Sequence, residues 1–161
     1  MVSCVFPGSF DPITKGHLNL ISRASALFDH VTVTVMNNIQ KKGSIPIERR
    51  VDLIRKACAD YSNVDVERWD GLLADYMHVK KERIIIRGIR NAAEMDSEMQ
   101  ICAANKFLNN SIETIFLPCD PLMSGISSSA VREIASFNGN IKEFVPDELT
   151  EEISGLLSKK V

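Results

Sequence analysis

Short apolar segments alternate with longer segments of helical periodicity along this chain, and this alternation restricts the possible folds more than any single motif does. Ile84, Ile85 and Ile86 are consecutive, which is typical of a strand buried on both faces. Strands that alternate with helices pair in parallel through right-handed crossovers. The pattern therefore predicts an α/β fold, a Rossmann-like, doubly wound, five-stranded parallel sheet with helices on both faces. The predicted strands are residues 2–6, 31–35, 64–66, 83–86 and 112–117, and the predicted helices are residues 18–28, 47–58, 72–77, 93–108, 127–137 and 148–157.

The sequence has no segment that looks like a boundary between domains. Its 161 residues show no internal repeat, low-complexity stretch or linker. A chain of this length can bury a substantial core as one unit. We therefore expect a single domain over residues 1–161, with C-terminal helices of about residues 127–161 packed on the core.

Composition argues against several functional classes. The formal net charge of −2 disfavours broad nucleic-acid binding, which normally shows a basic surplus. No segment approaches the roughly 18 apolar residues of a membrane span, and the N-terminus lacks the pattern of a signal peptide. We expect small-molecule partners, no membrane and a cytoplasmic location. Cys4, Cys58, Cys102 and Cys119 are too widely spaced for a metal or disulfide framework and are expected to be reduced thiols.

Phosphate-binding groups follow four of the predicted strands. In doubly wound sheets the ligand crevice opens at the carboxyl ends of the strands. Residues 8–12, with Gly16 and His17, link the first strand to the first helix, where backbone N–H groups and the helix dipole attract anions. The segment therefore indicates nucleotide binding. The other three loops carry Lys41 and Lys42, residues 87–90, and residues 124–129.

Each of these residues also has a purely structural interpretation. A histidine at a helix start is commonly a surface or capping residue, loop lysines are commonly solvated, and residues 127–129 contain a good N-cap. Arg87 and Arg90 end a buried strand and therefore need a carboxylate or phosphate partner. Glu98 is either that partner or an exposed helix residue. Asp11 is expected to organise its own turn rather than to act as a base.

Three motifs together carry a specific resemblance. They are P-G-S-F-D-P at 7–12 with T-x-G-H at 14–17, R-G-I-R at 87–90, and I-S-S-S at 126–129 with Arg132. This set resembles the nucleotidyltransferase superfamily of the [HT]-x-G-H and I-S-S-[ST] type. Within it, the chain is similar over nearly its whole length to the bacterial phosphopantetheine adenylyltransferases.

The resemblance implies an enzyme of coenzyme A biosynthesis. Its partners would be ATP and 4'-phosphopantetheine, and its products dephospho-coenzyme A and pyrophosphate, with coenzyme A as a candidate inhibitor and a homohexamer as the assembly. Magnesium, Mg2+, is the implied cofactor, held mainly by triphosphate oxygens and water. A phosphomonoester has a second pKa of about 6, so direct in-line attack on the α-phosphate of ATP needs no strong general base.

The resemblance also assigns roles to individual residues. His17 is the implied transition-state stabiliser at the α-phosphate, with Lys41 and Ser128 as further catalytic residues. No metal ligand is assigned. The 4'-phosphopantetheine site comprises Ser9, Lys41, Leu73 and Arg87. The ATP site comprises Ser9, Phe10, His17, Gly88, Ile89, Arg90, Glu98, Met123, Ser124, Gly125, Ile126, Ser127, Ser128 and Ser129.

Four positions depart from the usual family pattern. Ser9 replaces a threonine and keeps its hydroxyl, and Asn91 stands where alanine is usual. Ser97 and Gly125 stand where aromatic residues are usual. The loss of two aromatic side chains affects the expected packing around the nucleotide or the pantetheine arm. The charged residues remain, so the expected reaction class is unchanged.

Three other functions remain open on the sequence alone. A nicotinamide or nicotinate mononucleotide adenylyltransferase and a cytidylyltransferase for an alcohol phosphate such as glycerol phosphate share the superfamily pattern. Both more commonly have histidine at the position of Thr14. A noncatalytic nucleotide sensor is the third, and the presence together of His17, Lys41 and the serine run disfavours it.

Overall fold

A computed structural model describes residues 1–37 and 43–158. These residues form a five-stranded parallel sheet with the strand order β3-β2-β1-β4-β5, which confirms the predicted α/β fold. The strands are β1 (Ser3–Gly8), β2 (His30–Met36), β3 (Val64–Trp69), β4 (Ile84–Ile89) and β5 (Glu113–Pro118). The helices are α1 (Lys15–Leu27), α2 (Ile47–Ala57), α3 (Leu73–Lys80), α4 (Ala92–Leu108), α5 (Ser128–Ser136) and α6 (Thr150–Leu157), with 3-10 turns η1 (Pro121–Met123) and η2 (Asp147–Leu149).

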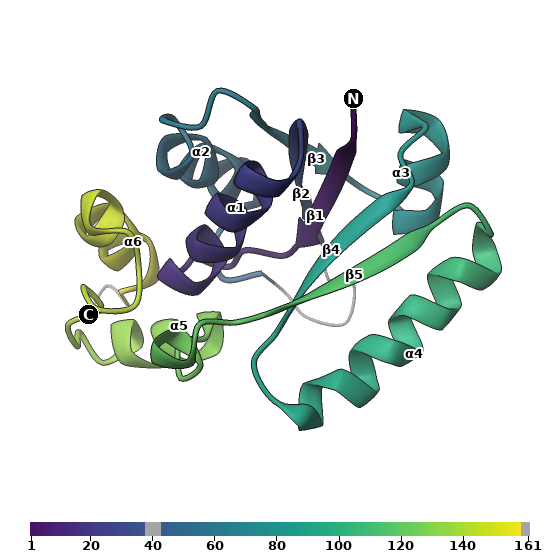
Figure 1. Ribbon diagram of the computed structural model, residues 1–161. Coiled ribbons are helices and arrows are strands. Elements are labelled where there is room, and N and C mark those ends of the chain that lie inside the picture. Colours follow the sequence, from purple (N-terminus) through teal and green to yellow (C-terminus); the bar gives the residue numbers. More distant parts are fainter. Residues whose placement is uncertain (38–42, 159–161) are drawn as a thin grey trace.

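Helices cover both faces of the sheet because the central strand is apolar on both sides. Successive side chains of a strand point to opposite faces. Cys4 and Phe6 of β1 belong to a large buried cluster, whereas Val5 between them belongs to a smaller one with Tyr76 and Met77 of α3. Figure 1 shows the same division, with α1, α2, α5 and α6 on one side of the sheet and α3 and α4 on the other.

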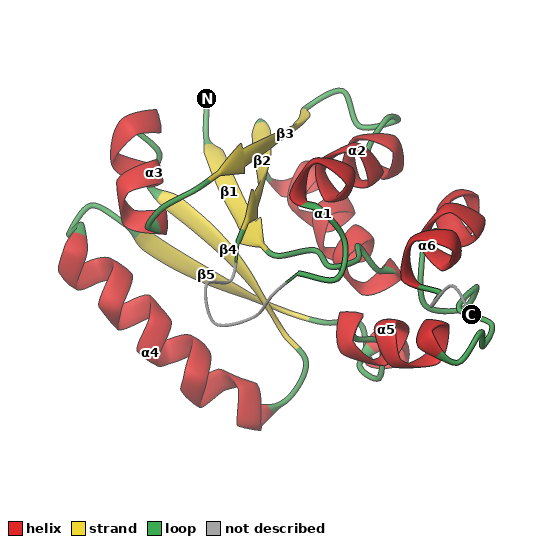
Figure 2. Cartoon of the chain, turned by 180° about the vertical axis from the view of Figure 1, so that it is seen from behind, coloured by secondary structure: helices red, strands yellow, loops and turns green. Residues whose placement is uncertain are grey.

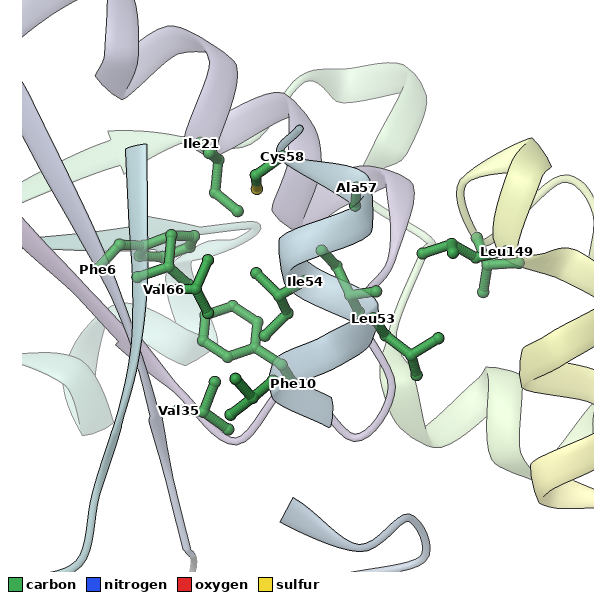
Figure 3. Packing of buried hydrophobic residues seen from close by; sticks show 14 of the residues in the cluster. Phe6, Phe10, Ile21, Val35, Leu53, Ile54, Ala57, Cys58, Val66 and Leu149 are labelled. Atoms are coloured by element: carbon green, nitrogen blue, oxygen red, sulfur yellow. The ribbon is translucent and has the colours of Figure 1, made fainter. Parts of the chain in front are cut away.

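The large cluster is built on the helical period of α2. Ile47, Val51 and Ile54 are spaced by four and three residues, so they share the face that is buried. Figure 3 shows Ile54 and Phe10 in the space between α2 and the sheet. Leu149 and Ile153 belong to the same cluster and bring the C-terminal segment against the far side of α2.

Helix α4 differs from the others because none of its residues is buried. It runs along the outer side of β4 and β5 (Figure 2). Met95, Met99, Ile101, Phe107 and Leu108 of this helix are exposed, and Phe107 retains 92% of its accessible surface. Within the described residues, no helix has the length and apolar character needed to cross a membrane.

The direction of winding reverses between β1 and β4. After β1 the chain builds β2 and β3 on one side, and it then returns to place β4 and β5 on the other. The loops that leave β1 and β4 therefore separate at the carboxyl edge of the sheet and leave a crevice, where ligands bind in sheets of this kind.

The α2 face generates a stability prediction. Ile54→Ala removes buried methyl groups from a side chain with 0% exposure, and we expect it to lower the free energy of unfolding by about 2–5 kcal/mol. Urea unfolding measures the change. Leu27→Ala is the matched control, because Leu27 is 67% exposed and its truncation should change stability by no more than about 0.5 kcal/mol. Equal losses in the two variants would contradict the assignment of this core.

Candidate active site

A cleft of about 730 Å³ lies at this reversal point. The turn after β1, the end of β4, and the segment between β5 and α5 contribute to its wall. Their meeting confirms the predicted common edge for three of the four loops, while Lys41 and Lys42 of the fourth lie outside the described residues. The predicted site residues that line it are Ser9, Phe10, His17, Arg87, Gly88, Arg90, Glu98, Met123, Ile126, Ser127, Ser128 and Ser129.

Five predicted site residues are not placed on the cleft wall by the structure. Ile89, Ser124 and Gly125 are not among the residues that line the cleft, although their neighbours are. Leu73 packs instead against the smaller cluster around α3. Lys41, like Lys42, lies outside the described residues.

The turn after β1 has an unusual backbone at Phe10. This residue has a φ of 45°, in the left-handed region that side chains other than glycine rarely adopt. Its ring makes edge contacts with Phe6 and His17, at centroid distances of 5.6 and 5.1 Å. A Cβ at Gly8 would lie 3.0 Å from this ring, so the glycine allows the ring to lie over the end of β1.

Three side chains from other elements bind the carbonyl oxygens of this turn. Arg50 of α2 donates Nη1–H to the Ser9 oxygen at 2.7 Å. From α5, Arg132 donates Nη1–H to the Asp11 oxygen at 2.6 Å, and the Ser128 hydroxyl donates to the Pro12 oxygen at 2.7 Å. These donors satisfy three carbonyl acceptors of the turn and hold it against α2 and α5. We refer to Arg50, Arg132 and Ser128 as the carbonyl clamp.

Asp11 acts over a longer range than the sequence analysis predicted. Its two carboxylate oxygens accept the N–H groups of Ser44 and Ile45, at 2.8 and 2.9 Å, instead of organising its own turn. The expectation of a local turn is therefore wrong. A buried carboxylate can satisfy any backbone donor that the fold brings near, and here the segment before α2 supplies two. Asp11 joins the turn to that segment.

His17 is held in one tautomer by the start of α1. Its Nδ1 accepts the backbone N–H of Thr14 at 3.1 Å, while the Thr14 hydroxyl accepts the backbone N–H of His17 at 3.3 Å. This is a capping box in which histidine takes the place of the usual glutamate or glutamine. Because Nδ1 is an acceptor, a neutral ring carries its proton on Nε2. His17 thus satisfies both the capping interpretation and the placement expected of a ligand-binding residue.

The pKa of His17 favours this neutral form. Burial first, and then the positive charges of Arg90 and Arg87, together lower the pKa from 6.5 to about 4. The residue is only partly buried, because it lines the cleft. The His17 ring is therefore an uncharged hydrogen-bond donor at neutral pH.

The two arginines at the end of β4 have carboxylate partners. Arg87 donates Nε–H and Nη2–H to the two oxygens of Glu98, at 2.6 and 2.7 Å, and Nη1–H to the Pro7 oxygen at 3.0 Å. Arg90 pairs with Glu94 and donates to the Ile126 oxygen at 3.2 Å. The prediction that these guanidinium groups need an anionic partner is confirmed, with Glu98 as the partner of Arg87. Both cations remain on the cleft wall.

Each serine of the I-S-S-S motif has its own hydrogen bond. Ser127 caps α5 by accepting the Ala130 N–H at 3.1 Å, and Ser129 accepts from Arg132 at 3.1 Å. Ser128 belongs to the carbonyl clamp. Capping accounts for one serine of the three, as the sequence analysis expected. All three line the cleft at the amino end of α5, where the helix dipole favours an anion.

No protein metal cage is present in the part of the chain that the structure describes. No three His, Cys, Asp or Glu side chains come together there. The carboxylates that line the cleft are Asp11, Glu94 and Glu98, and each is bound by backbone N–H groups or by an arginine. A magnesium ion in this cleft would therefore depend on oxygens brought by a ligand.

Arg50 and Asn37 are site residues that were not predicted from the sequence. Both line the cleft, and Arg50 donates Nη2–H to the Asn37 Oδ1 at 3.0 Å. A signal for Arg50 was present. It lies three residues after Ile47 and four before Ile54, on the apolar face of a helix where a charged side chain is unexpected.

Comparisons with known proteins agree with this geometry. Residues 5–134 match the family model described as cytidylyltransferase-like. A phosphopantetheine adenylyltransferase of Clostridium perfringens is 49% identical over 154 residues, covering 96% of this chain and 94% of that protein. The same enzyme of Finegoldia magna is 44% identical over 156 residues, covering 97% and 96%. A putative nicotinate-nucleotide adenylyltransferase from Vibrio parahaemolyticus has the same fold, with a TM-score of 0.65, 18% identity, and coverage of 98% of this chain and 92% of that one.

The His17 environment predicts a pH dependence of stability. The pKa is about 4 in the folded protein and 6.5 in its unperturbed state, so between these values the unfolded chain binds a proton that the folded chain does not. The stabilisation from neutral His17 is complete above about pH 6.5 and is lost as the pH falls toward 4. Urea unfolding should therefore show that the free energy of unfolding falls more between pH 7.5 and pH 5 in the wild type than in His17→Gln.

The control for this measurement is a histidine elsewhere on the surface. His78 is exposed near the end of α3, and His78→Gln should retain the wild-type pH dependence. A His17→Gln protein that loses as much stability as the wild type between the two pH values would show that His17 is not held neutral.

Proposed function

The chain belongs to the phosphopantetheine adenylyltransferase family within the cytidylyltransferase-like proteins, and we propose that it transfers the adenylyl group of ATP to 4'-phosphopantetheine. The products are dephospho-coenzyme A and pyrophosphate. The observation that carries this proposal is identity of 44–49% to enzymes of that name over nearly the whole chain. The gathering of the three family motifs around one cleft agrees with it.

The chemistry fits a site without a general base. The attacking group is a phosphomonoester that is already largely ionised near neutral pH, since its second pKa is about 6. The reaction therefore needs in-line alignment with the α-phosphate and stabilisation of the charge on the transferring group and on the leaving pyrophosphate. Each of the cleft carboxylates is committed to a structural partner, which agrees with this requirement.

His17 stabilises the transferring phosphoryl group as a neutral donor. Its Nδ1 is occupied by the Thr14 N–H, so Nε2–H is the group that a phosphate oxygen on the cleft side can accept. A donor fixed in this way by a helix cap needs little reorganisation during the reaction.

Positive charge in the site comes from arginines and from a helix end. Arg87 and Arg90 lie at the end of β4, and residues 127–129 present the amino end of α5. We assign Arg87 and Lys41 to the phosphate of 4'-phosphopantetheine and Leu73 to its pantetheine arm, and we assign Arg90 and the serines to ATP. Ser9 lies on the turn that both substrates share. A substrate phosphate at Arg87 competes with Glu98 for its N–H groups.

Magnesium enters the proposal as a counter-ion only. When bound, it would offset the negative charge of the triphosphate, held by phosphate oxygens and water. No residue is assigned to it. A cytoplasmic location and inhibition by coenzyme A are further parts of the proposal that rest on the family resemblance.

We also propose that α4 is covered by other copies of this chain, in the homohexamer that the resemblance implies. Met95 and Met99 lie on one side of α4, and Ile101 and Leu108 lie on another. A helix that is apolar on several sides is normally buried, but no residue of α4 is buried in the single chain. Phe107 is 92% exposed, which adds to an apolar surface of the kind that marks association.

The proposed reaction predicts pyrophosphate release when the protein is mixed with ATP, 4'-phosphopantetheine and magnesium. His17→Ala should lower kcat by about 100- to 1,000-fold, because a fixed donor to the transferring group is lost, while calorimetry still detects ATP binding. His78→Ala is the matched control and should retain normal turnover. Turnover with nicotinate mononucleotide in place of 4'-phosphopantetheine would overturn the assignment. So would the absence of turnover with either substrate.

The α4 surface predicts the state of association. Light scattering should give six times the 17.9 kDa chain mass for the wild type, and Phe107→Glu should give smaller species because it places charge in an apolar contact. Leu27→Glu, on the exposed end of α1, should remain a hexamer. A monodisperse monomeric wild type would contradict this part of the proposal.

A further inference from the structure

Arg50 is a buried cation of the cleft wall that the proposed mechanism does not use. It is 4% exposed, whereas its neighbour Arg49 is exposed and pairs with Glu152 of α6. The Arg50 guanidinium donates to two neutral oxygens, the Ser9 carbonyl at 2.7 Å and the Asn37 side-chain amide at 3.0 Å. Among the described residues, its buried Nε has no hydrogen-bond partner.

This arrangement is not what helix packing alone would favour. Burial lowers the pKa of Arg50, which shows that the environment disfavours the charge, although Asp11 and Glu48 act in the opposite direction. An apolar side chain at this position would continue the Ile47 and Ile54 face without that penalty. The buried charge therefore needs another explanation, and its contact with Ser9 supplies one.

The contact with Ser9 fixes the orientation of one peptide group. In a trans peptide the C=O and N–H point in opposite directions. Because the Ser9 carbonyl points at Arg50, the Phe10 N–H points away from it. Within the described residues, no backbone carbonyl accepts this N–H, yet Phe10 is 2% exposed and lines the cleft. A shielded donor of this kind suits a phosphate oxygen.

The backbone at Phe10 depends on such a contact. A φ of 45° is unfavourable for an aromatic residue and persists only where the surroundings impose it. Packing of the ring fixes the side chain, and the Arg50 hydrogen bond fixes the preceding carbonyl. A Cβ at Gly43 would lie 3.0 Å from Arg50 Nη2, so the segment before α2 is also shaped around the guanidinium.

We propose that Arg50 is a positioning residue for adenylyl transfer, which holds the Ser9–Phe10 peptide so that the Phe10 N–H donates to the transferring phosphate. The proposal rests on the function proposed above and extends it, because Arg50 acts through the turn and makes no contact with substrate. A donor that strengthens its hydrogen bond in the transition state affects kcat more than KM.

Kinetics of Arg50→Met and Arg50→Lys test this role. Met keeps the length but removes both donors, and we expect kcat to fall about 100-fold with KM for ATP changed less than about threefold. Lys keeps the charge but lacks the fork that reaches two acceptors, so we expect a smaller loss of about tenfold. Arg49→Met is the matched control on the same helix and should stay within about twofold of wild type.

A second measurement observes the peptide directly and applies to any variant that folds. With a nonhydrolysable ATP analogue, the amide resonance of Phe10 should shift in the wild type and in Arg49→Met. It should shift much less in Arg50→Met or Arg50→Lys. Should Arg50→Met fail to fold by circular dichroism, the comparison uses Arg50→Lys. A purely structural role for Arg50 would lower thermal stability and leave this shift unchanged.

The two proposals fail in different ways. A wild type that releases no pyrophosphate from ATP and 4'-phosphopantetheine overturns the proposed function. Wild-type turnover in a folded Arg50 variant, a change confined to KM, or an unchanged Phe10 amide shift overturns the positioning role while the proposed function stands.

Discussion

The site depends on how the turn between β1 and α1 is held. Arg50 from α2, and Arg132 and Ser128 from α5, bind three carbonyl oxygens of this turn. These donors come from positions 41 to 121 residues away in the sequence, so the turn takes its shape only when both helices have packed on the sheet. Because the Ser9 carbonyl points at Arg50, the Phe10 N–H of the same peptide points away from it and can serve an anion. The core that positions α2 therefore also prepares the phosphate site.

The same turn sets the chemical state of His17. The Thr14 cap makes Nδ1 an acceptor, and burial beside two arginines keeps the ring neutral. A protonated His17 would lose the cap hydrogen bond and would add a third cation beside Arg87 and Arg90. The site thus separates two tasks, with permanent charge on the arginines and directed hydrogen bonding on the histidine and the backbone. Such a division suits a reaction whose nucleophile is already ionised.

Much of the fold and part of the site could be predicted from local pattern. The consecutive residues Ile84 to Ile86 and the alternating valines of β2 are apolar patterns that indicate buried strands. The strands, and the edge of the sheet at which their loops meet, could therefore be predicted from the sequence. That Arg87 has an anionic partner was predictable because a guanidinium at a buried strand end needs one, whereas its identity as Glu98 was left open. The contacts of Asp11 were not predictable. The N–H groups that its carboxylate accepts lie 33 and 34 residues away in the sequence and meet it only in the folded chain. The packing of Leu73 against the smaller cluster depends on which sheet face α3 covers, and the local pattern does not show that.

The most direct test of this account is a crystal structure with a nonhydrolysable ATP analogue at neutral pH. We predict that oxygens of the α-phosphate accept hydrogen bonds from His17 Nε2 and from the Phe10 N–H, with the Arg50 to Ser9 contact and the Thr14 to His17 cap both intact. A nucleotide bound with its α-phosphate away from this turn, or a His17 ring turned so that Nδ1 faces the phosphate, would contradict the central claim that the clamped turn and the capped histidine together form the adenylyl-transfer site.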